Sequence, residues 1–179
     1  MSTCHIALLR GINVGTAKRV AMAELRILVA ELGYTEVRTL LNSGNVVFHG
    51  KVKSAPAAAA EIEAALLART GVAARVMLLQ RDELDAIVAA CPLGDKPDGA
   101  RVLIYLLRPG YARAPLASLA AGSWGEEVLV LGERAAYLWC PDGALESRAA
   151  AALGKLLGDT TTARNWNTLC KLQALAHAR

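Results

Sequence analysis

The chain contains few aromatic residues, with one Phe, three Trp and four Tyr among its 179 residues. Its core must therefore be built mainly from Ala, Leu and Val, and hydrophobic residues make up 54% of the sequence. Charged residues account for only 20%, so a folded chain with a substantial core is expected and a disordered one is excluded. The length suits one domain of ordinary size or two small ones.

Paired cysteines are also missing. The four cysteines form no C-x-x-C motif, and the three histidines do not stand at metal-ligand spacings, so we predict no metal site and no cofactor. No basic segment precedes the first apolar run, and no apolar run reaches the roughly 18–20 residues of a membrane helix. We therefore expect a cytoplasmic protein with reduced thiols and no membrane partner.

Several motifs that define enzyme classes are absent, namely G-x-S-x-G, D-x-D and H-E-x-x-H. A catalytic triad is assembled in space and needs no local motif, so the sequence leaves an enzyme open. The best candidate for a general base is His5, within the first apolar run.

Positive charge is concentrated at the two ends of the chain. Residues 1–50 carry five basic and three acidic side chains, residues 51–146 carry ten and twelve, and residues 147–179 carry five and one. This distribution is compatible with an anionic partner, and equally with a solvated basic face.

The hydrophobic pattern of the first half predicts the order β-α-β-β-α-β, a ferredoxin-like unit over about residues 3–80. The second half repeats β-α-β-β-α over 101–157 and ends in two helices, at about 146–157 and 164–177. We therefore predict an α+β fold of two packed ferredoxin-like (α/β-plait) units with C-terminal helices. The predicted boundary lies at 92–99, where Pro, Gly and Asp cluster, which divides the chain into residues 1–92 and 93–179.

A glycine loop follows the first predicted strand. Glycines let backbone N–H groups approach a ligand closely, and basic side chains complete an anion site. The spacing matches neither a P-loop nor a G-x-G-x-x-G motif, so a loop that merely needs left-handed turns is an equal alternative. The candidate binding residues are Arg10, Gly11, Asn13, Gly15 and Lys18.

Two further motifs are polar. "NSGN", with Ser43 and Asn45, is typical of a hairpin turn and also places polar groups at a sheet edge. In the predicted last helix, with Thr161 or Thr162 as its cap, a polar stripe falls within about a 100° arc. The candidates from this segment are Arg164, Asn165, Asn167, Thr168 and Lys171.

The stretches "ALLRGINVG", "SGNVVF" and "ARNWNT" resemble those of the bacterial family called domain of unknown function 1697, over about residues 4–176. The resemblance implies two α/β-plait units and no established activity. Two positions depart from the family pattern, Thr16 in place of a glycine and Ala163 in place of a Thr-like residue. After "PDG" the family has S-K-L, whereas Ser147 is here followed by Arg148.

Three functions remain open from the sequence. The first is binding of an anionic ligand (a nucleotide, a phosphorylated metabolite or a nucleic-acid backbone) between the glycine loop and the "RNWNT" helix. The second is a structural or interaction protein whose motifs hold the two units together, with Asn and Arg side chains bonded to backbone carbonyls. The third is an enzyme acting on a small phosphorylated or carboxylated substrate.

Overall fold

The computed structural model of the protein describes residues 3–13 and 19–178. The chain forms two compact units, Met1–Leu84 with Lys171–Arg179, and Asp85–Cys170. The division falls within helix α3 (Arg81–Ala89) and within helix α6 (Trp166–His177). Each unit is built on its own four-stranded sheet.

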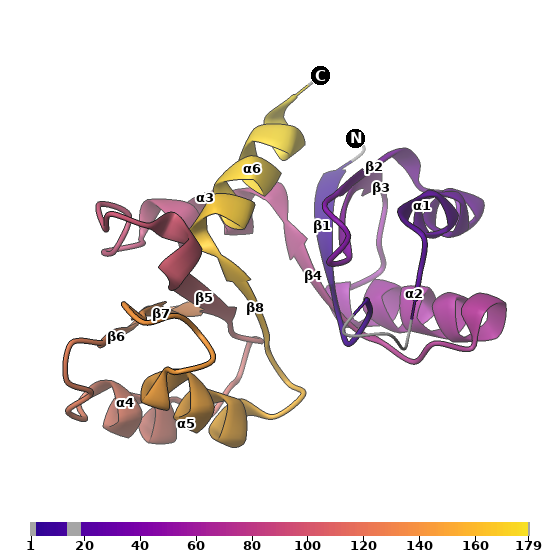
Figure 1. Cartoon of the computed structure of the whole chain (residues 1–179). Helices are drawn as coiled ribbons and strands as arrows, with labels where there is room; N and C mark the ends of the chain where they lie inside the picture. Colours follow the sequence, from indigo (N-terminus) through magenta and orange to yellow (C-terminus); the bar gives the residue numbers. More distant parts are fainter. Residues whose placement is uncertain (1–2, 14–18, 179) are drawn as a thin grey trace. The chain divides into compact units, whose positions relative to one another are not determined.

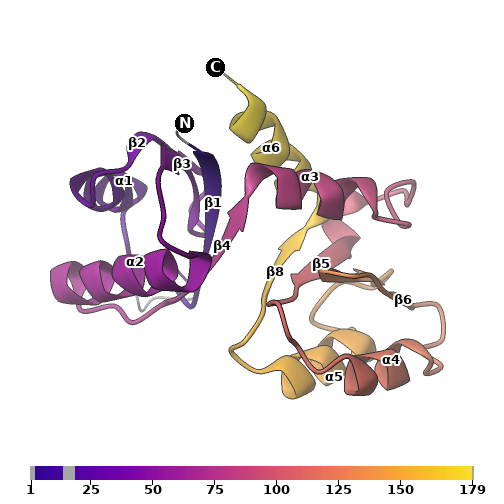
Figure 2. The same cartoon turned by 180° about the vertical axis from the view of Figure 1, so that it is seen from behind.

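The first unit has the element order β-α-β-β-α-β that the sequence predicts. Its strands lie in the order β2-β3-β1-β4, and every neighbouring pair is antiparallel. Both helices cover the same face of this sheet (Figures 1 and 2). The elements are β1 (Thr3–Arg10), α1 (Met22–Glu31), β2 (Thr35–Leu40), β3 (Asn45–Gly50), α2 (Ala55–Thr70) and β4 (Arg75–Gln80).

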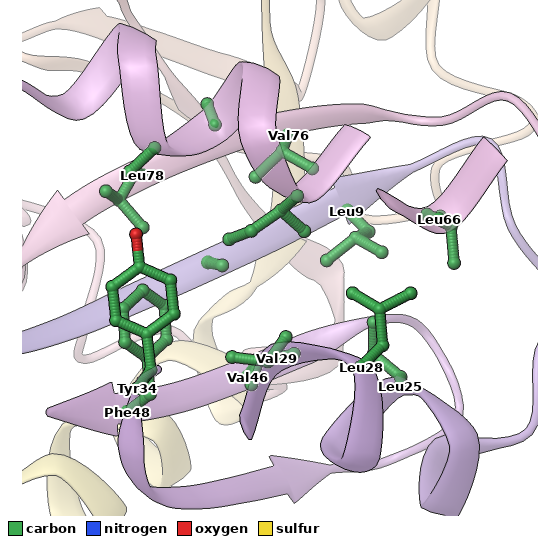
Figure 3. Packing of buried hydrophobic residues seen from close by; sticks show 14 of the residues in the cluster. Leu9, Leu25, Leu28, Val29, Tyr34, Val46, Phe48, Leu66, Val76 and Leu78 are labelled. Atoms are coloured by element: carbon green, nitrogen blue, oxygen red, sulfur yellow. The ribbon is translucent and has the colours of Figure 1, made fainter. Parts of the chain in front are cut away.

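The core of the first unit lies between this sheet and its two helices (Figure 3). Alternate residues of the strands, such as Leu9 and Val46, meet Leu28 and Leu66 of the helices, as the period of two along a strand requires. The Tyr34 ring packs on Phe48, the single phenylalanine of the chain, with ring centroids 4.4 Å apart. The six central residues of β1 are buried, as its continuous apolar run indicates.

Local sequence fixes the ends of α2. The Ser54 hydroxyl accepts a hydrogen bond from the backbone N–H of Ala57 at 3.2 Å and caps the first turn. Gly71 ends the helix in the left-handed conformation, with φ of 69°, which costs glycine little.

The second unit repeats the topology of the first. Its strand order is β6-β7-β5-β8, and each neighbouring pair is again antiparallel. Helices α4 and α5 cover one face of the sheet (Figures 1 and 2). After a short 3-10 turn, η1 (Gly99–Arg101), the elements are β5 (Val102–Leu106), α4 (Arg113–Ala120), β6 (Val128–Leu131), β7 (Ala135–Trp139), α5 (Arg148–Leu157) and β8 (Thr162–Asn165).

Strand β8 corrects the sequence prediction of a helix beginning at 164. Thr162–Asn165 pairs along β5, with Leu106 opposite Thr162 and Leu103 opposite Asn165. The strand completes the second ferredoxin-like unit, and α6 starts only at Trp166. The segment is extended because it pairs with β5, some sixty residues earlier in the chain. The residues of the segment itself do not indicate this pairing.

The core of the second unit lies between its sheet and helices α4 and α5, and includes Tyr105, Leu138 and Leu153. Tyr137 is also buried, and its hydroxyl donates to the carbonyl oxygen of Ile87 in α3 at 2.8 Å. Burial raises the pKa of Tyr137 to about 12. No helix of the described residues is long and apolar enough to cross a membrane.

Replacing Gly44 with alanine tests how closely the β2–β3 hairpin packs on β1. Gly44 has φ of 77°, and an added Cβ would lie 2.7 Å from Cβ of Leu9. We expect Gly44→Ala to lower the free energy of unfolding by about 3 kcal/mol, from backbone strain and overpacking together. Urea unfolding measures this change.

Gly71→Ala is the matched control, because φ there is 69° and an added Cβ meets nothing within 4 Å. Its expected cost is the backbone strain alone, about 1–2 kcal/mol. Equal losses in the two variants would show that the close contact with Leu9 is relaxed at no cost.

Candidate functional site

The glycine loop and the "NSGN" hairpin meet at one corner of the first unit. The backbone N–H of Leu9 donates to the carbonyl oxygen of Gly44 at 2.8 Å. The Asn13 side chain donates from Nδ2 to the carbonyl oxygen of Asn42 at 2.7 Å. We call this region, comprising Arg10, Gly11, Asn13, Asn42 and Ser43, the glycine-loop corner.

Asn13 closes the glycine loop on itself. Its Oδ1 accepts from the backbone N–H of Val20 at 2.8 Å, and its Nδ2 donates to the carbonyl oxygen of Val20 at 3.0 Å. The residue has φ of 54°, a conformation that asparagine tolerates better than most residues. The predicted binding residues Gly15 and Lys18 fall inside this loop and lie outside the described residues.

Asn45 is fully buried at the start of β3. Its Nδ2 donates to the carbonyl oxygen of Leu40 at 2.8 Å and to the hydroxyl of Ser43 at 2.9 Å. Its side chain therefore fixes the hairpin and does not face solvent. Ser43, which is exposed, presents the only hydroxyl among the residues of the glycine-loop corner.

Three arginines lie at or next to this corner. Arg10 is exposed at the end of β1, and its register partner on β4 is Arg75, whose guanidinium lies 3.5 Å from the Glu63 carboxylate. Arg19, also exposed, precedes Val20, which Asn13 holds. Sequence reasoning missed Arg75 and Arg19, although in a ferredoxin-like order β4 runs antiparallel to β1 and so begins where β1 ends.

Helix α1 begins at this corner without a side-chain cap. Its N-cap residue is Ala21, one residue beyond Val20, and this residue provides no side-chain cap hydrogen bond. Helix α5 shows the opposite case, because the Ser147 hydroxyl and the Glu127 carboxylate both accept from its first turn. The start of α1 therefore offers backbone donors and a partial positive charge, with Glu24 the acidic residue of its first turn.

The "RNWNT" motif lies in the second unit and departs from the prediction of one polar helical face. Arg164 is in strand β8, where its Nη1 donates to the hydroxyl of Thr162 at 2.9 Å and to the carbonyl oxygen of Ala163 at 2.8 Å. It is partly buried, and desolvation lowers its pKa to about 10.

The cap of α6 is Asn165, not Thr161 or Thr162 as the sequence predicts. Its Oδ1 accepts from the backbone N–H of Thr168 at 2.9 Å, whereas the Thr161 hydroxyl donates to the carbonyl oxygen of Leu106. Of the other predicted stripe residues, Thr168 is buried, and Asn167 and Lys171 are exposed. The predicted stripe is therefore wrong as a single helical face, because Arg164 lies on a strand and its other members lie on the helix.

The catalytic candidates are shielded. His5 is 2% exposed and so out of reach of a substrate, and burial lowers its pKa. All four cysteines are free thiols whose pKa values are raised by burial, which disfavours the nucleophilic thiolate. Within residues 3–13 and 19–178, no group of His, Cys, Asp and Glu is arranged to hold a metal ion.

Replacing Asn13 tests whether it holds the corner together. Asn13→Ala removes three hydrogen bonds to backbone atoms and places alanine at a positive φ. We expect the free energy of unfolding to fall by about 2–3 kcal/mol. Denaturant unfolding measures this loss. For the control Asn42→Ala, which keeps the backbone carbonyl that accepts from Asn13, we expect the free energy of unfolding to fall by less than about 0.5 kcal/mol. Similar losses in both variants would contradict this role of Asn13.

Comparisons with known proteins were consistent with this fold. The solved structure of the conserved bacterial protein SP0830 from Streptococcus pneumoniae is similar, with a TM-score of 0.79 and 24% identity, over 98% of this chain and 99% of that one. At this identity the similarity shows the fold alone. No curated protein matches the chain significantly. The model of a family described as protein of unknown function (DUF1697) matches residues 1–137, and the chain belongs to this family.

Proposed function

We propose that the protein binds a small anionic ligand at the glycine-loop corner of its first unit. The observation that carries this proposal is the set of hydrogen bonds from Asn13 to Val20 and Asn42. They bring the end of β1, the hairpin and the start of α1 to one fixed place. A preorganised site of this kind loses little entropy when a ligand binds.

The charge at the corner supports an anion. Arg10 and Arg19 are exposed, and the uncapped N-terminus of α1 adds a partial positive charge. Gly11, with φ of 86° and open space where a Cβ would be, leaves its backbone accessible. Guanidinium groups and backbone donors are the groups that bind phosphate and carboxylate oxygens in proteins.

The ligand we favour is a small phosphate-bearing molecule rather than a nucleic acid. Base stacking by a ferredoxin-like sheet needs aromatic side chains on its central strands. Phe48 on β3 is buried against the helices, and β1 has no aromatic residue apart from the buried ring of His5. Binding to a nucleic-acid backbone would use the same arginines and would weaken steeply with salt.

A structural role for the motifs is the second candidate, and a specific observation favours it. The amides of Asn13, Asn45 and Asn165 all bond to backbone atoms, as does the guanidinium of Arg164. These hydrogen bonds to the backbone are enough to explain why the motifs contain these residues. The two candidates therefore differ in what they require of Arg10 and Arg19, which only the binding role needs to be accessible to a ligand.

An enzymatic role has no comparable support in the described residues. The His5 ring is buried, and the exposed Ser43 hydroxyl accepts a hydrogen bond from Asn45. We therefore propose binding without a catalytic step.

The experiment is a thermal-shift panel of nucleotides, sugar phosphates, polyphosphate and short single-stranded oligonucleotides, at low and moderate salt. A ligand at about one hundred times its Kd should stabilise the protein by roughly 2.7 kcal/mol, which raises Tm by about 5–10 °C. The double variant Arg10→Gln, Arg19→Gln should lose this shift and keep the Tm of the free protein.

Arg26→Gln is the matched control, because Arg26 is exposed on α1 but outside the corner. It should keep the shift. A panel that gives no shift, together with a double variant that melts early, would favour the structural role. A shift that survives the double variant would place the ligand elsewhere.

A further inference from the structure

A hollow lies at the opposite end of β1 from the glycine-loop corner, within the first unit. Two adjoining spaces of about 200 Å³ and 530 Å³ share His49 and Arg81 in their walls. Cys4 lines the smaller space and His177 the larger. Since β1 is eight residues long, the hollow and the corner are about 20 Å apart.

The histidines of the chain gather at this end of the unit. His49 lies at the end of β3 and lines both spaces, and His177, in the last turn of α6, lines the larger one. The third, His5, is buried on β1 opposite Phe48 and does not line either space. Two separate segments of the sequence, the end of β3 and the end of α6, thus bring imidazoles to the hollow, and no local motif indicates this.

Arg81 supplies the cation of the hollow. Its Nε lies 3.4 Å from Oδ1 of Asp82, and this contact leaves the terminal Nη nitrogens without a hydrogen bond to any residue in the described ranges. The Nη groups of an arginine form a planar fork that matches the two oxygens of a carboxylate or phosphate. Arg81 is partly exposed, so a ligand can reach this fork from solvent.

Glu36 lies beside the imidazole of His49. The Oε1 of Glu36 lies 3.9 Å from Nδ1 of His49, and Glu36 has φ of 51° where the pairing of β2 with β3 shifts register. The two acidic groups of the hollow are thus each beside a base, Asp82 beside Arg81 and Glu36 beside His49.

The thiol of Cys4 lines the hollow but is not a reactive group. Its Sγ donates to the carbonyl oxygen of Ala176 at 3.7 Å, and burial raises the pKa of this thiol. A protonated thiol bonded to a backbone carbonyl is a poor nucleophile. The hollow therefore has the character of a binding site.

We propose that this hollow is a second ligand site, which binds a small molecule carrying a phosphate or carboxylate group. The Nη fork of Arg81 binds the oxyanion, and the Nε2–H of His49 donates a hydrogen bond to an adjacent oxygen of the ligand. The larger space falls within the range of 300–1,000 Å³ common for small-molecule sites. This site is independent of the glycine-loop corner, with which it shares no residue.

Histidine side-chain NMR of the full chain tests the proposal, because only three imidazoles give signals. Inorganic phosphate and acetate are titrated separately at constant pH and ionic strength. We expect saturable shifts of the His49 and His177 signals with at least one of the two anions, and no matching change at the buried His5. The anion that binds more tightly assigns the class of the ligand.

Arg81→Gln should weaken this binding about tenfold or more, as expected when hydrogen bonds to a charged group are lost. Arg69→Gln, an exposed arginine paired with Glu31, is the matched control and should bind as the unaltered protein does. Arg10→Gln should also leave the signals unchanged, which separates this site from the glycine-loop corner. Shifts that do not saturate with either anion, or that persist in Arg81→Gln, would overturn the proposal.

Discussion

The glycine-loop corner depends on one side chain, the amide of Asn13. Its oxygen accepts from the backbone N–H of Val20 and its nitrogen donates to the carbonyl oxygen of the same residue, the pair of bonds that two β-strands exchange. The nitrogen also donates to the carbonyl oxygen of Asn42 in the hairpin. These bonds link the residues after β1 to the hairpin and to the entry of α1.

The sequence predicts most of the fold because most helices and strands are marked by their own hydrophobic pattern and by their cap and turn residues. The alternation in β3, the Ser54 cap and Gly71 place their elements without knowledge of the rest of the chain. Strand β8 could not be found in this way, because "TARN" carries no strand pattern and owes its conformation to pairing with β5. The sequence favours Thr161 or Thr162 as the cap of the last helix, whereas Asn165, another residue type that favours this position, forms it.

The candidate site was predictable in part for a related reason. Sequence spacing finds polar motifs, but it does not show whether an amide faces solvent or a backbone carbonyl. Asn45 proved to be buried and bonded within its hairpin, whereas Arg10 is exposed. The hollow at the other end of β1 gave no signal in the sequence at all, because His49, Arg81 and His177 become neighbours only when the sheet forms and the end of α6 joins the first unit.

The irregular pairing at Glu36 has a consequence for how the protein behaves at high concentration. Strand β2 is an edge of the first sheet, and an edge strand presents unpaired N–H and C=O groups to which a strand of another molecule can add. The register shift between Thr35 and Arg38, with Glu36 in the left-handed conformation, interrupts the regular spacing of these groups. The residue that lies beside His49 therefore also makes this edge a poor template for a strand of another molecule.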